Sequence, residues 1–233
     1  MIKILIGGIG SGKSVSLTRF ILSRNNKVFV NFPCKHPNVI RLKESHIIET
    51  IVIGMKKNGE QITRQQLNYK FWTDFIEQHG RCDIVIDEAH NILNSRRSSS
   101  GHNLLFTSFL TQCRKLFGES EQNHLILATQ RINAVDIVAR QLAEEIIYCS
   151  KQLDKYHFDD TRVLERGVYK TKPINGVYVL QTIFRGERCL EAFEVWRDTG
   201  IKTYDDKIMF YANPLFQFYE SYALIDFGQS VYL

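Results

Sequence analysis

The sequence predicts an α/β fold with a mainly parallel central sheet, helices on both faces of that sheet, and a small β-rich C-terminal extension. A glycine-rich loop separates an apolar run, residues 2–6, from an amphipathic helical pattern that begins near Lys13. Short apolar runs then alternate with helical patterns as far as about residue 150. Apolar strands that alternate with helices are typical of a parallel sheet that is buried on both faces.

The individual elements follow from these patterns in chain order. Strands are expected at residues 2–6, 27–32, 49–53, 83–86, 124–129 and 145–149. Helices are expected at residues 15–24, 67–79, 104–117 and 134–144. Gly80 and Gly118 end the second and third of these helices, and Asn133 is a suitable N-cap for the fourth.

The pattern changes after about residue 150, which predicts an ATPase-type core over residues 1–150 and an extension over residues 151–233 packed on it. Residues 162–170, 177–185 and 188–197 are expected to form successive antiparallel strands, with a strong turn signal at Asn175-Gly176. The tail is rich in aromatic side chains, namely Phe216, Phe218, Tyr219, Tyr222, Phe227 and Tyr232. We expect the tail to pack against the core rather than to bind a ligand.

Composition and charge are those of an ordinary globular protein, with 44% hydrophobic residues. No apolar stretch approaches the roughly 18 residues that a membrane-spanning helix needs, and a chain that begins with a core strand leaves no room for a signal peptide. The five cysteines stand singly, which favours reduced thiols and a cytoplasmic location, in a host cell if the protein is viral. The net charge of +5 suits a polyanionic partner, but solubility alone also explains it.

Residues 7–14 read GGIGSGKS, which is the spacing of a phosphate-binding loop. Glycines permit the tight turn that brings successive backbone N–H groups to a phosphate. In this pattern Lys13 contacts the β- and γ-phosphates of ATP, and the Ser14 hydroxyl ligates Mg²⁺. A chance turn is the poorer interpretation, because a strand precedes the loop and a helix follows it. The predicted nucleotide-binding residues are Gly7, Gly8, Gly10, Ser11, Gly12, Lys13, Ser14 and Val15.

Two acidic residues follow the apolar run at residues 84–86. Paired with a phosphate-binding loop, Asp87 is expected to hold Mg²⁺ together with Ser14. Glu88 is expected to polarise the water that attacks the γ-phosphate. A kinase does not require an activated water, so Glu88 favours ATP hydrolysis over phosphoryl transfer to a metabolite. The alternative is a strand that simply runs into a polar turn.

Gln130 ends a third apolar run, residues 125–129. Ligands of open α/β sheets bind at the carboxyl ends of central strands. Gln130 is therefore predicted to contact the γ-phosphate and the attacking water, and so to sense hydrolysis. Its alternative role is to cap backbone groups at the end of the strand.

The run from residue 112 to residue 141, which contains Arg114 and then HLILATQRINAVDIVARQ, resembles the core of the FtsK–HerA superfamily of DNA-pumping ATPases. Together with GGIGSGKS and IVIDEAH, the resemblance covers about the first 150 residues. Size, the N-terminal loop and the tail LFQFYESYALI are similar to the zonular-occludens-toxin-like branch, which occurs in viruses and mobile elements and acts in virion morphogenesis or genome packaging. The resemblance implies a RecA-like P-loop NTPase of the additional-strand, catalytic-glutamate type.

The same resemblance implies a ring oligomer, usually a hexamer, in which an arginine of one subunit completes the site of its neighbour. Arg114 matches the family position best, and Arg131 and Arg140 are the other candidates. An arginine of this kind is worth about 10³–10⁵ in rate. Each of the three is equally well explained as a solvated charge on a helix or loop.

A basic segment, residues 94–103, follows the acidic pair and is expected to be a flexible loop. Arg96 and Arg97 would contact DNA phosphates from it without reading sequence. A surface loop without a partner is at least as good an interpretation. The string DEAH at residues 87–90 also occurs in helicases, but the chain is too short for two helicase domains.

The sequence thus predicts a Mg²⁺-dependent ATPase that moves double-stranded or single-stranded DNA, most simply to package the genome of a virus or mobile element. Capsid or other virion proteins are further candidate partners. Two alternatives stay open. One is a nucleotide-gated scaffold in virion assembly, and the other is a P-loop kinase of small molecules.

Overall fold

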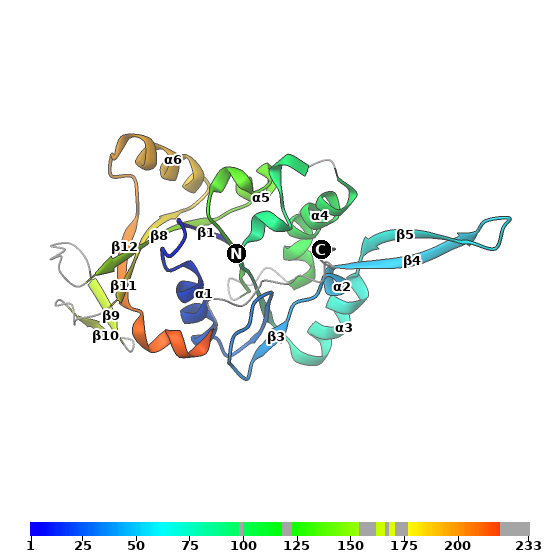
Figure 1. Ribbon diagram of the computed structural model, residues 1–233, viewed down its shortest axis with the longest axis horizontal. Coiled ribbons are helices and arrows are strands. Elements are labelled where there is room, and N and C mark those ends of the chain that lie inside the picture. The colour runs from blue at the N-terminus through cyan, green and yellow to red at the C-terminus, as the bar shows by residue number, and fades with distance from the viewer. Residues whose placement is uncertain (98–99, 118–122, 154–161, 166–167, 171–176, 220–233) are drawn as a thin grey trace.

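A computed structural model describes residues 1–97, 100–117, 123–153, 162–165, 168–170 and 177–219. The described residues form a ten-stranded sheet in the order β10-β9-β12-β11-β8-β1-β7-β6-β2-β3 (Figure 1). Its strands are β1 (Ile2–Ile6), β2 (Lys27–Val30), β3 (Val39–Arg41), β6 (Cys82–Ile86), β7 (Leu125–Thr129), β8 (Glu145–Leu153), β9 (Arg162–Glu165), β10 (Val168–Lys170), β11 (Val177–Arg185) and β12 (Asp206–Tyr211).

The six strands from β8 to β3 are all parallel, which confirms the predicted fold class. Ile4 of β1 lies opposite both Leu127 of β7 and Ile146 of β8. Every residue of β6 and β7 is buried, as expected for central strands covered on both faces. β7 lies between β1 and β6, so an additional strand separates the glycine-rich loop from the acidic pair.

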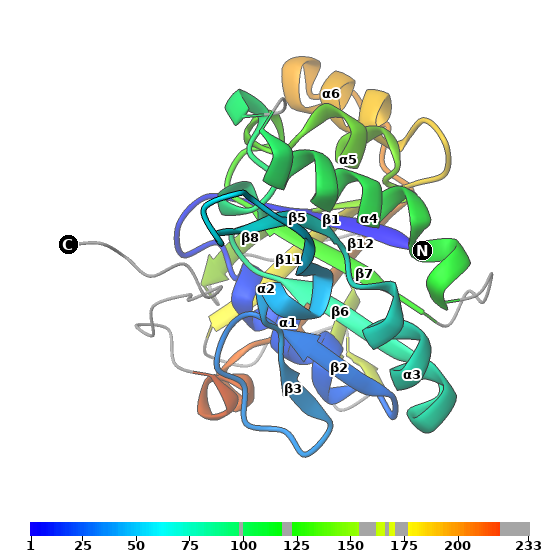
Figure 2. The ribbon, with the colours of Figure 1, turned by 90° about the vertical axis from the view of Figure 1, so that its right-hand side faces the viewer.

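The helices are divided unequally between the two faces of the sheet. They are α1 (Lys13–Leu22), α2 (Glu44–Ile47), α3 (Tyr69–His79), α4 (Gly101–Phe117), α5 (Ile137–Gln141) and α6 (Cys189–Thr199). Figure 2 shows α4, α5 and α6 on one side of the sheet and α1 on the other. The larger core, with Trp72, Phe106 and Phe193, lies under the first group, and a smaller core with Leu17 and Ile21 lies under α1.

The C-terminal strands continue the same sheet. β11 pairs antiparallel with β8 over its whole length, and β12 pairs antiparallel with β11. The strand expected at residues 162–170 is divided into β9 and β10, which pair with each other. Asn175-Gly176 lies outside the described residues.

The strand predicted at residues 188–197 is wrong, because this segment is the helix α6. Cys189 and Phe193 are both buried and Trp196 packs against them, which is the spacing of one helix face. Gly200 ends the helix in the left-handed conformation, at φ +73°. The antiparallel partner of β11 is β12 instead, a strand that the sequence patterns did not reveal.

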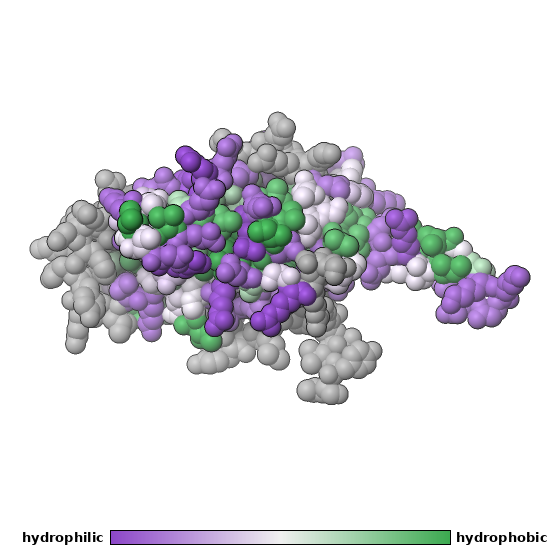
Figure 3. Space-filling view, turned by 90° about the horizontal axis from the view of Figure 1, so that it is seen from above, coloured by the Kyte–Doolittle hydropathy of each residue, from purple (hydrophilic) through white to green (hydrophobic). Residues whose placement is uncertain are grey.

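A two-stranded hairpin projects from the body of the molecule (Figure 1). It consists of β4 (Ile48–Met55) and β5 (Gln61–Leu67), which pair antiparallel and form a sheet separate from the main one. The strand expected at residues 49–53 is therefore real, but it lies outside the central sheet. Figure 3 shows hydrophobic surface along this hairpin and a hydrophilic tip.

Other boundaries differ by short distances. α3 begins at Tyr69, and Asn68 caps it through a hydrogen bond from the Phe71 N–H. The N-cap of α5 is Asp136, not Asn133, because the Asp136 carboxylate accepts the Val138 N–H. The segment expected to be one loop at residues 94–103 contains a 3₁₀ turn, η2 (Ser95–Arg97), and the first residues of α4. In the part of the chain that the structure describes, no helix combines the length and apolar character required to span a membrane.

Candidate active site

The glycine-rich loop connects β1 to the N-terminus of α1 at the carboxyl edge of the sheet. Two of its glycines are required by packing. A Cβ at Gly12 would overlap the Val179 side chain of β11, and a Cβ at Gly7 would lie 2.6 Å from the Cys149 carbonyl oxygen. Gly12 also has φ +96°, and Gly10 has φ +72°. The backbone of this loop is thus held close to β8 and β11, with the α1 N-terminus directed at the space above it.

Lys13 is almost completely buried within the curve of this loop. Its Nζ donates to the Gly7 carbonyl at 2.8 Å and to the Gly8 carbonyl at 3.1 Å. The ammonium group therefore lies inside the loop, at the N-terminus of α1. A cation next to a helix N-terminus makes a site for a phosphate.

Ser14 and Asp87 meet beside this point. The Ser14 hydroxyl donates to Asp87 Oδ2 at 2.8 Å. Burial raises the pKa of the Asp87 carboxyl, and the hydrogen bond from Ser14 opposes that effect. A divalent cation next to the carboxylate would favour its charged form. The two hard oxygen donors therefore fit Mg²⁺.

Glu88 directly follows Asp87 after the end of β6, and its backbone has an unusual conformation. Its φ is +49°, the one positive φ among the non-glycine residues that the structure describes. Its N–H donates to Asp87 Oδ1 at 2.9 Å, which stabilises this turn. The turn directs the side chain away from the strand, toward the pocket above the loop.

The Glu88 carboxylate lies between Gln130 and His90. Gln130 Nε2 donates to Oε1 at 3.4 Å, and His90 Nδ1 lies 3.3 Å from Oε2. The structure thus brings Glu88 and Gln130 together, as the order of the strands requires, since β6 and β7 are neighbours. His90 is a third member of this cluster, and its Nδ1 lies 3.5 Å from the Thr129 hydroxyl.

Asn31 is a site residue that the sequence reasoning missed. It follows β2 and is almost completely buried. Its Oδ1 accepts the Asp87 N–H and its Nδ2 donates to the Asp87 carbonyl, both at 2.8 Å. This double hydrogen bond fixes the main chain from which the acidic pair projects. A polar residue directly after an apolar run, as with Gln130, was the available signal.

These elements surround a cavity of about 530 Å³ above the phosphate-binding loop. Residues 9–15 and Glu88 form one side of it. The other side is formed by residues of the C-terminal half: Lys151, Val177, Val179, Ala212, Phe216 and Tyr219. A cavity of this size, lined by both polar and apolar groups, can hold a small molecule such as a nucleotide.

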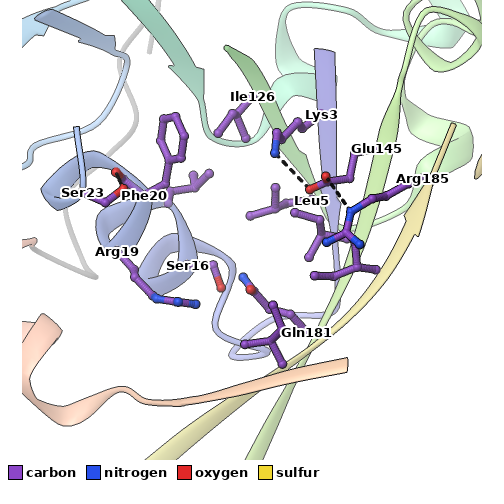
Figure 4. Close-up of a pocket in the computed structure, with 14 residues that line it drawn as sticks. Lys3, Leu5, Ser16, Arg19, Phe20, Ser23, Ile126, Glu145, Gln181 and Arg185 are labelled. Atoms are coloured by element: carbon purple, nitrogen blue, oxygen red, sulfur yellow. Dashed lines mark hydrogen bonds and ion pairs between the residues drawn. The ribbon is translucent and has the colours of Figure 1, made fainter. Parts of the chain in front are cut away.

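A second cavity, of about 300 Å³, lies between α1 and the sheet (Figure 4). None of residues 7–14 lines it. At one end Glu145 accepts from Lys3 at 3.2 Å and lies 3.5 Å from the Arg185 guanidinium. Since the phosphate-binding loop does not line this second cavity, the candidate catalytic chemistry belongs to the first one.

Of the arginines predicted to act in trans, Arg131 and Arg140 do not line the cavity above the phosphate-binding loop. Arg114 lies in α4, and its side chain is outside the described residues. Arg140 contacts its own subunit, donating to the Val135 carbonyl at 3.1 Å and to Asn133 Oδ1 at 3.2 Å. Arg131 is exposed next to Gln130.

The predicted DNA-contact residues lie in η2. Arg96 is exposed, while the side chain of Arg97 is outside the described residues. This segment is tied to residues that follow β7, because Ser95 donates to the Asn133 carbonyl at 2.9 Å and Asn94 bridges to Val135. Arg96 does not line the cavity.

The chain is similar to several solved structures, among them a toxin domain and a viral NTPase. The N-terminal domain of zonular occludens toxin from Neisseria meningitidis is 13% identical, with a TM-score of 0.49, and the match covers 94% of this chain and 98% of that one. The genome packaging NTPase B204 of Sulfolobus turreted icosahedral virus 2, in complex with ATP-γS, is 14% identical with a TM-score of 0.41, over 63% of this chain and 74% of that one. Curated proteins include no significant match in sequence.

The family of the chain is shown by a sequence model rather than by these distant structures. The model described as AAA domain matches residues 1–137, which is more than half of the chain. The matched part contains the glycine-rich loop, Asp87, Glu88 and Gln130. The chain is therefore a P-loop NTPase that belongs to the AAA domain family.

Proposed function

We propose that this protein is an ATP-hydrolysing DNA translocase that acts as a ring oligomer and moves or packages the genome of a virus or mobile element. The observation that carries the proposal is the position of Glu88. Its carboxylate lines the cavity above Lys13 and Ser14 and is held by Gln130. An acidic group at this place serves hydrolysis, whereas a kinase must bring an acceptor there.

In the proposed reaction, Lys13 and the loop amides bind the phosphates of ATP. Ser14 and Asp87 would hold Mg²⁺, which would supply positive charge to the phosphates. Glu88 orients a water and accepts its proton as the water oxygen bonds to the γ-phosphorus and the bond to the ADP oxygen breaks. Gln130 donates to the same water or to the γ-phosphate. Arg114 of a neighbouring subunit is proposed to stabilise the charge of the transition state.

The link to DNA is supported by the sequence resemblance to DNA-pumping ATPases and by the net charge of +5. Arg96 is exposed on a segment that lies shortly after the acidic pair in the chain. A displacement of Glu88 would therefore be transmitted to Arg96 through a short stretch of backbone. We further propose that residues 1–150 form the motor core and that residues 151–233 form an extension packed on it. The protein is proposed to act in the cytoplasm. The pairing of β8 with β11 supports a firm junction between the two parts.

The test is a steady-state ATPase assay of the purified chain with Mg²⁺, without DNA, with double-stranded DNA and with single-stranded DNA. We expect turnover that either DNA stimulates severalfold. Turnover that requires an added small-molecule acceptor would indicate a kinase. Nucleotide binding without any turnover would indicate a nucleotide-gated scaffold in virion assembly.

A further inference from the structure

One short C-terminal segment forms half of the cavity wall opposite the phosphate-binding loop, and the rest of this wall comes from Lys151, Val177 and Val179. After β12 the chain forms the 3₁₀ segment η4 (Asn213–Phe218), which lies against α1. Ala212, Phe216 and Tyr219 of this stretch line the cavity together with Val177. The phosphate-binding loop and this wall therefore face each other across one space.

Hydrogen bonds hold this segment at both ends. At its start, the Ala212 N–H donates to the Val177 carbonyl at 2.8 Å, and the Val177 N–H donates to Asn213 Oδ1 at 3.0 Å. At its end, the Lys35 N–H donates to the Phe218 carbonyl at 2.8 Å, and Tyr219 bridges to Cys34. The wall is thus fixed to β11 on one side and to the residues after β2 on the other.

Two aromatic rings of this wall are presented to the cavity. Phe216 is 43% exposed although it is large and apolar, and Tyr219 is half-buried. Their ring centroids lie 6.3 Å apart with planes tilted by 48°. An exposed aromatic ring in a pocket that also contains a phosphate site offers an apolar face to a flat ligand group at a fixed distance from the phosphates.

We propose that Phe216 and Tyr219 form the surface on which the base of the bound nucleotide stacks. The proposal rests on the proposed function, because it requires a triphosphate at Lys13 and Ser14. Among the described side chains that line the cavity, Glu88 is the one carboxylate, and none is an amide. The rings of Phe216 and Tyr219 would contact the flat face of the base, which adenine and guanine share, so the two are expected to bind with affinities within about tenfold of each other.

The test compares two ligands that share the phosphates and differ in the base. Isothermal titration with ATP and with inorganic tripolyphosphate, both with Mg²⁺, is performed on the full chain and its variants. Phe216→Ala is expected to weaken ATP binding about tenfold, in line with about 1–3 kcal/mol per stacked base. Its tripolyphosphate binding stays at the wild-type value. Phe216→Tyr keeps the ring and retains ATP affinity.

Gln217→Ala is the matched control in the same segment, because Gln217 is exposed and its side chain donates to the Pro214 carbonyl rather than lining the cavity. It is expected to bind both ligands like the wild type. Unchanged ATP binding by Phe216→Ala overturns the proposal, and so does an equal loss for ATP and tripolyphosphate, which would show that the segment only supports the loop. Failure of the proposed function looks different: the wild type then binds ATP in a Phe216-dependent manner without hydrolysing it.

Discussion

At the scale of single residues, Asn31 is the support on which the acidic pair depends. Asn31→Ala leaves the buried N–H and carbonyl of Asp87 without partners, which is expected to cost about 2–4 kcal/mol of unfolding free energy. Loss of this support should displace the carboxylates of Asp87 and Glu88. The displacement should lower kcat for ATP hydrolysis by a larger factor than it raises KM. Urea denaturation and steady-state kinetics check both effects.

The control for this variant is Asn26→Ala. Asn26 makes one long contact, 3.5 Å from Nδ2 to Asp83 Oδ2, so the change should cost less than about 1 kcal/mol. A wild-type kcat in a stably folded Asn31→Ala protein would show that Asn31 does not position Asp87 and Glu88.

Substitutions at two glycines of the phosphate-binding loop distinguish the effect of backbone strain from the effect of steric overlap. Gly10 has a positive φ and nothing within 4 Å of an added Cβ, so Gly10→Ala is expected to cost only about 1–2 kcal/mol. Gly12→Ala adds an overlap with Val179 and should abolish ATP binding. Isothermal titration and urea denaturation measure the two effects.

The double variant Gly12→Ala with Val179→Ala removes the overlap and leaves the strain. It is expected to regain part of the stability lost by Gly12→Ala alone. Equal ATP affinity and equal stability of the Gly10→Ala and Gly12→Ala proteins would show that the close approach of β11 to the loop affects neither property.

At the scale of elements, the hairpin of β4 and β5 stands apart from the central sheet, and side chains of its strand β4 are exposed. Val52, Ile53 and Met55 all have more than half of their surface exposed. Thr50 and Gln65 are paired, so an Asn-Gly turn can join them in place of residues 51–64. This deletion should change the unfolding free energy by less than about 1 kcal/mol and leave ATP binding intact.

A change at the base of the same hairpin provides the contrast. Leu67 is buried in the larger core, and Leu67→Ala is expected to cost about 2–5 kcal/mol. Urea denaturation of both variants checks the comparison. Collapse of the fold on deletion of residues 51–64 would mean that the hairpin supports the body.

Strands and helices were predictable from the sequence where the spacing of the apolar residues fitted only one of the two structures. β1, β6 and β7 are short apolar runs with clear ends, and the sequence located all three. The α6 segment contains apolar residues that also fit an alternating pattern, and the helical spacing of Cys189, Phe193 and Trp196 decided its structure. The hairpin carried a usable signal, since Asn58-Gly59 is the same turn pair that was recognised at residues 175–176.

The candidate site was predictable in its phosphate-binding half only. The loop spacing, Asp87, Glu88 and Gln130 are local patterns, and parallel strands bring their ends to one edge. Asn31, Lys151 and Phe216 contribute to the site through the strand order and the path of the chain after β12. These are long-range features. Only Asn31 carried a local signal, as a polar residue directly after an apolar run.

At the scale of the whole molecule, His124 makes stability depend on pH. Burial, together with the nearby cations Lys3 and Arg24, lowers the pKa of His124 to about 4. Below its ordinary pKa of 6.5, the unfolded chain binds a proton at His124 that the folded chain does not, so stability falls as the pH drops from 6.5 to 4. The ring is only half-buried, and we expect a loss of about 1–2 kcal/mol after solvent screening.

The variant His124→Asn keeps the backbone N–H that donates to Asp83 Oδ1 but removes the titrating ring. Between pH 7.5 and pH 4.5 it should lose less unfolding free energy than the wild type, as measured by urea denaturation. Parallel pH dependences of the two proteins would exclude His124 as the cause.

The proposed hydrolysis depends most on Glu88, the residue proposed to activate the water. The decisive measurement is the ATP turnover number of Glu88→Gln beside its ATP affinity, with Glu60→Gln at the exposed hairpin tip as the control. The account predicts an unchanged affinity and a turnover lower by about 10²–10⁴-fold, while the Glu60 variant retains wild-type turnover. Wild-type turnover in a folded Glu88→Gln protein would contradict it.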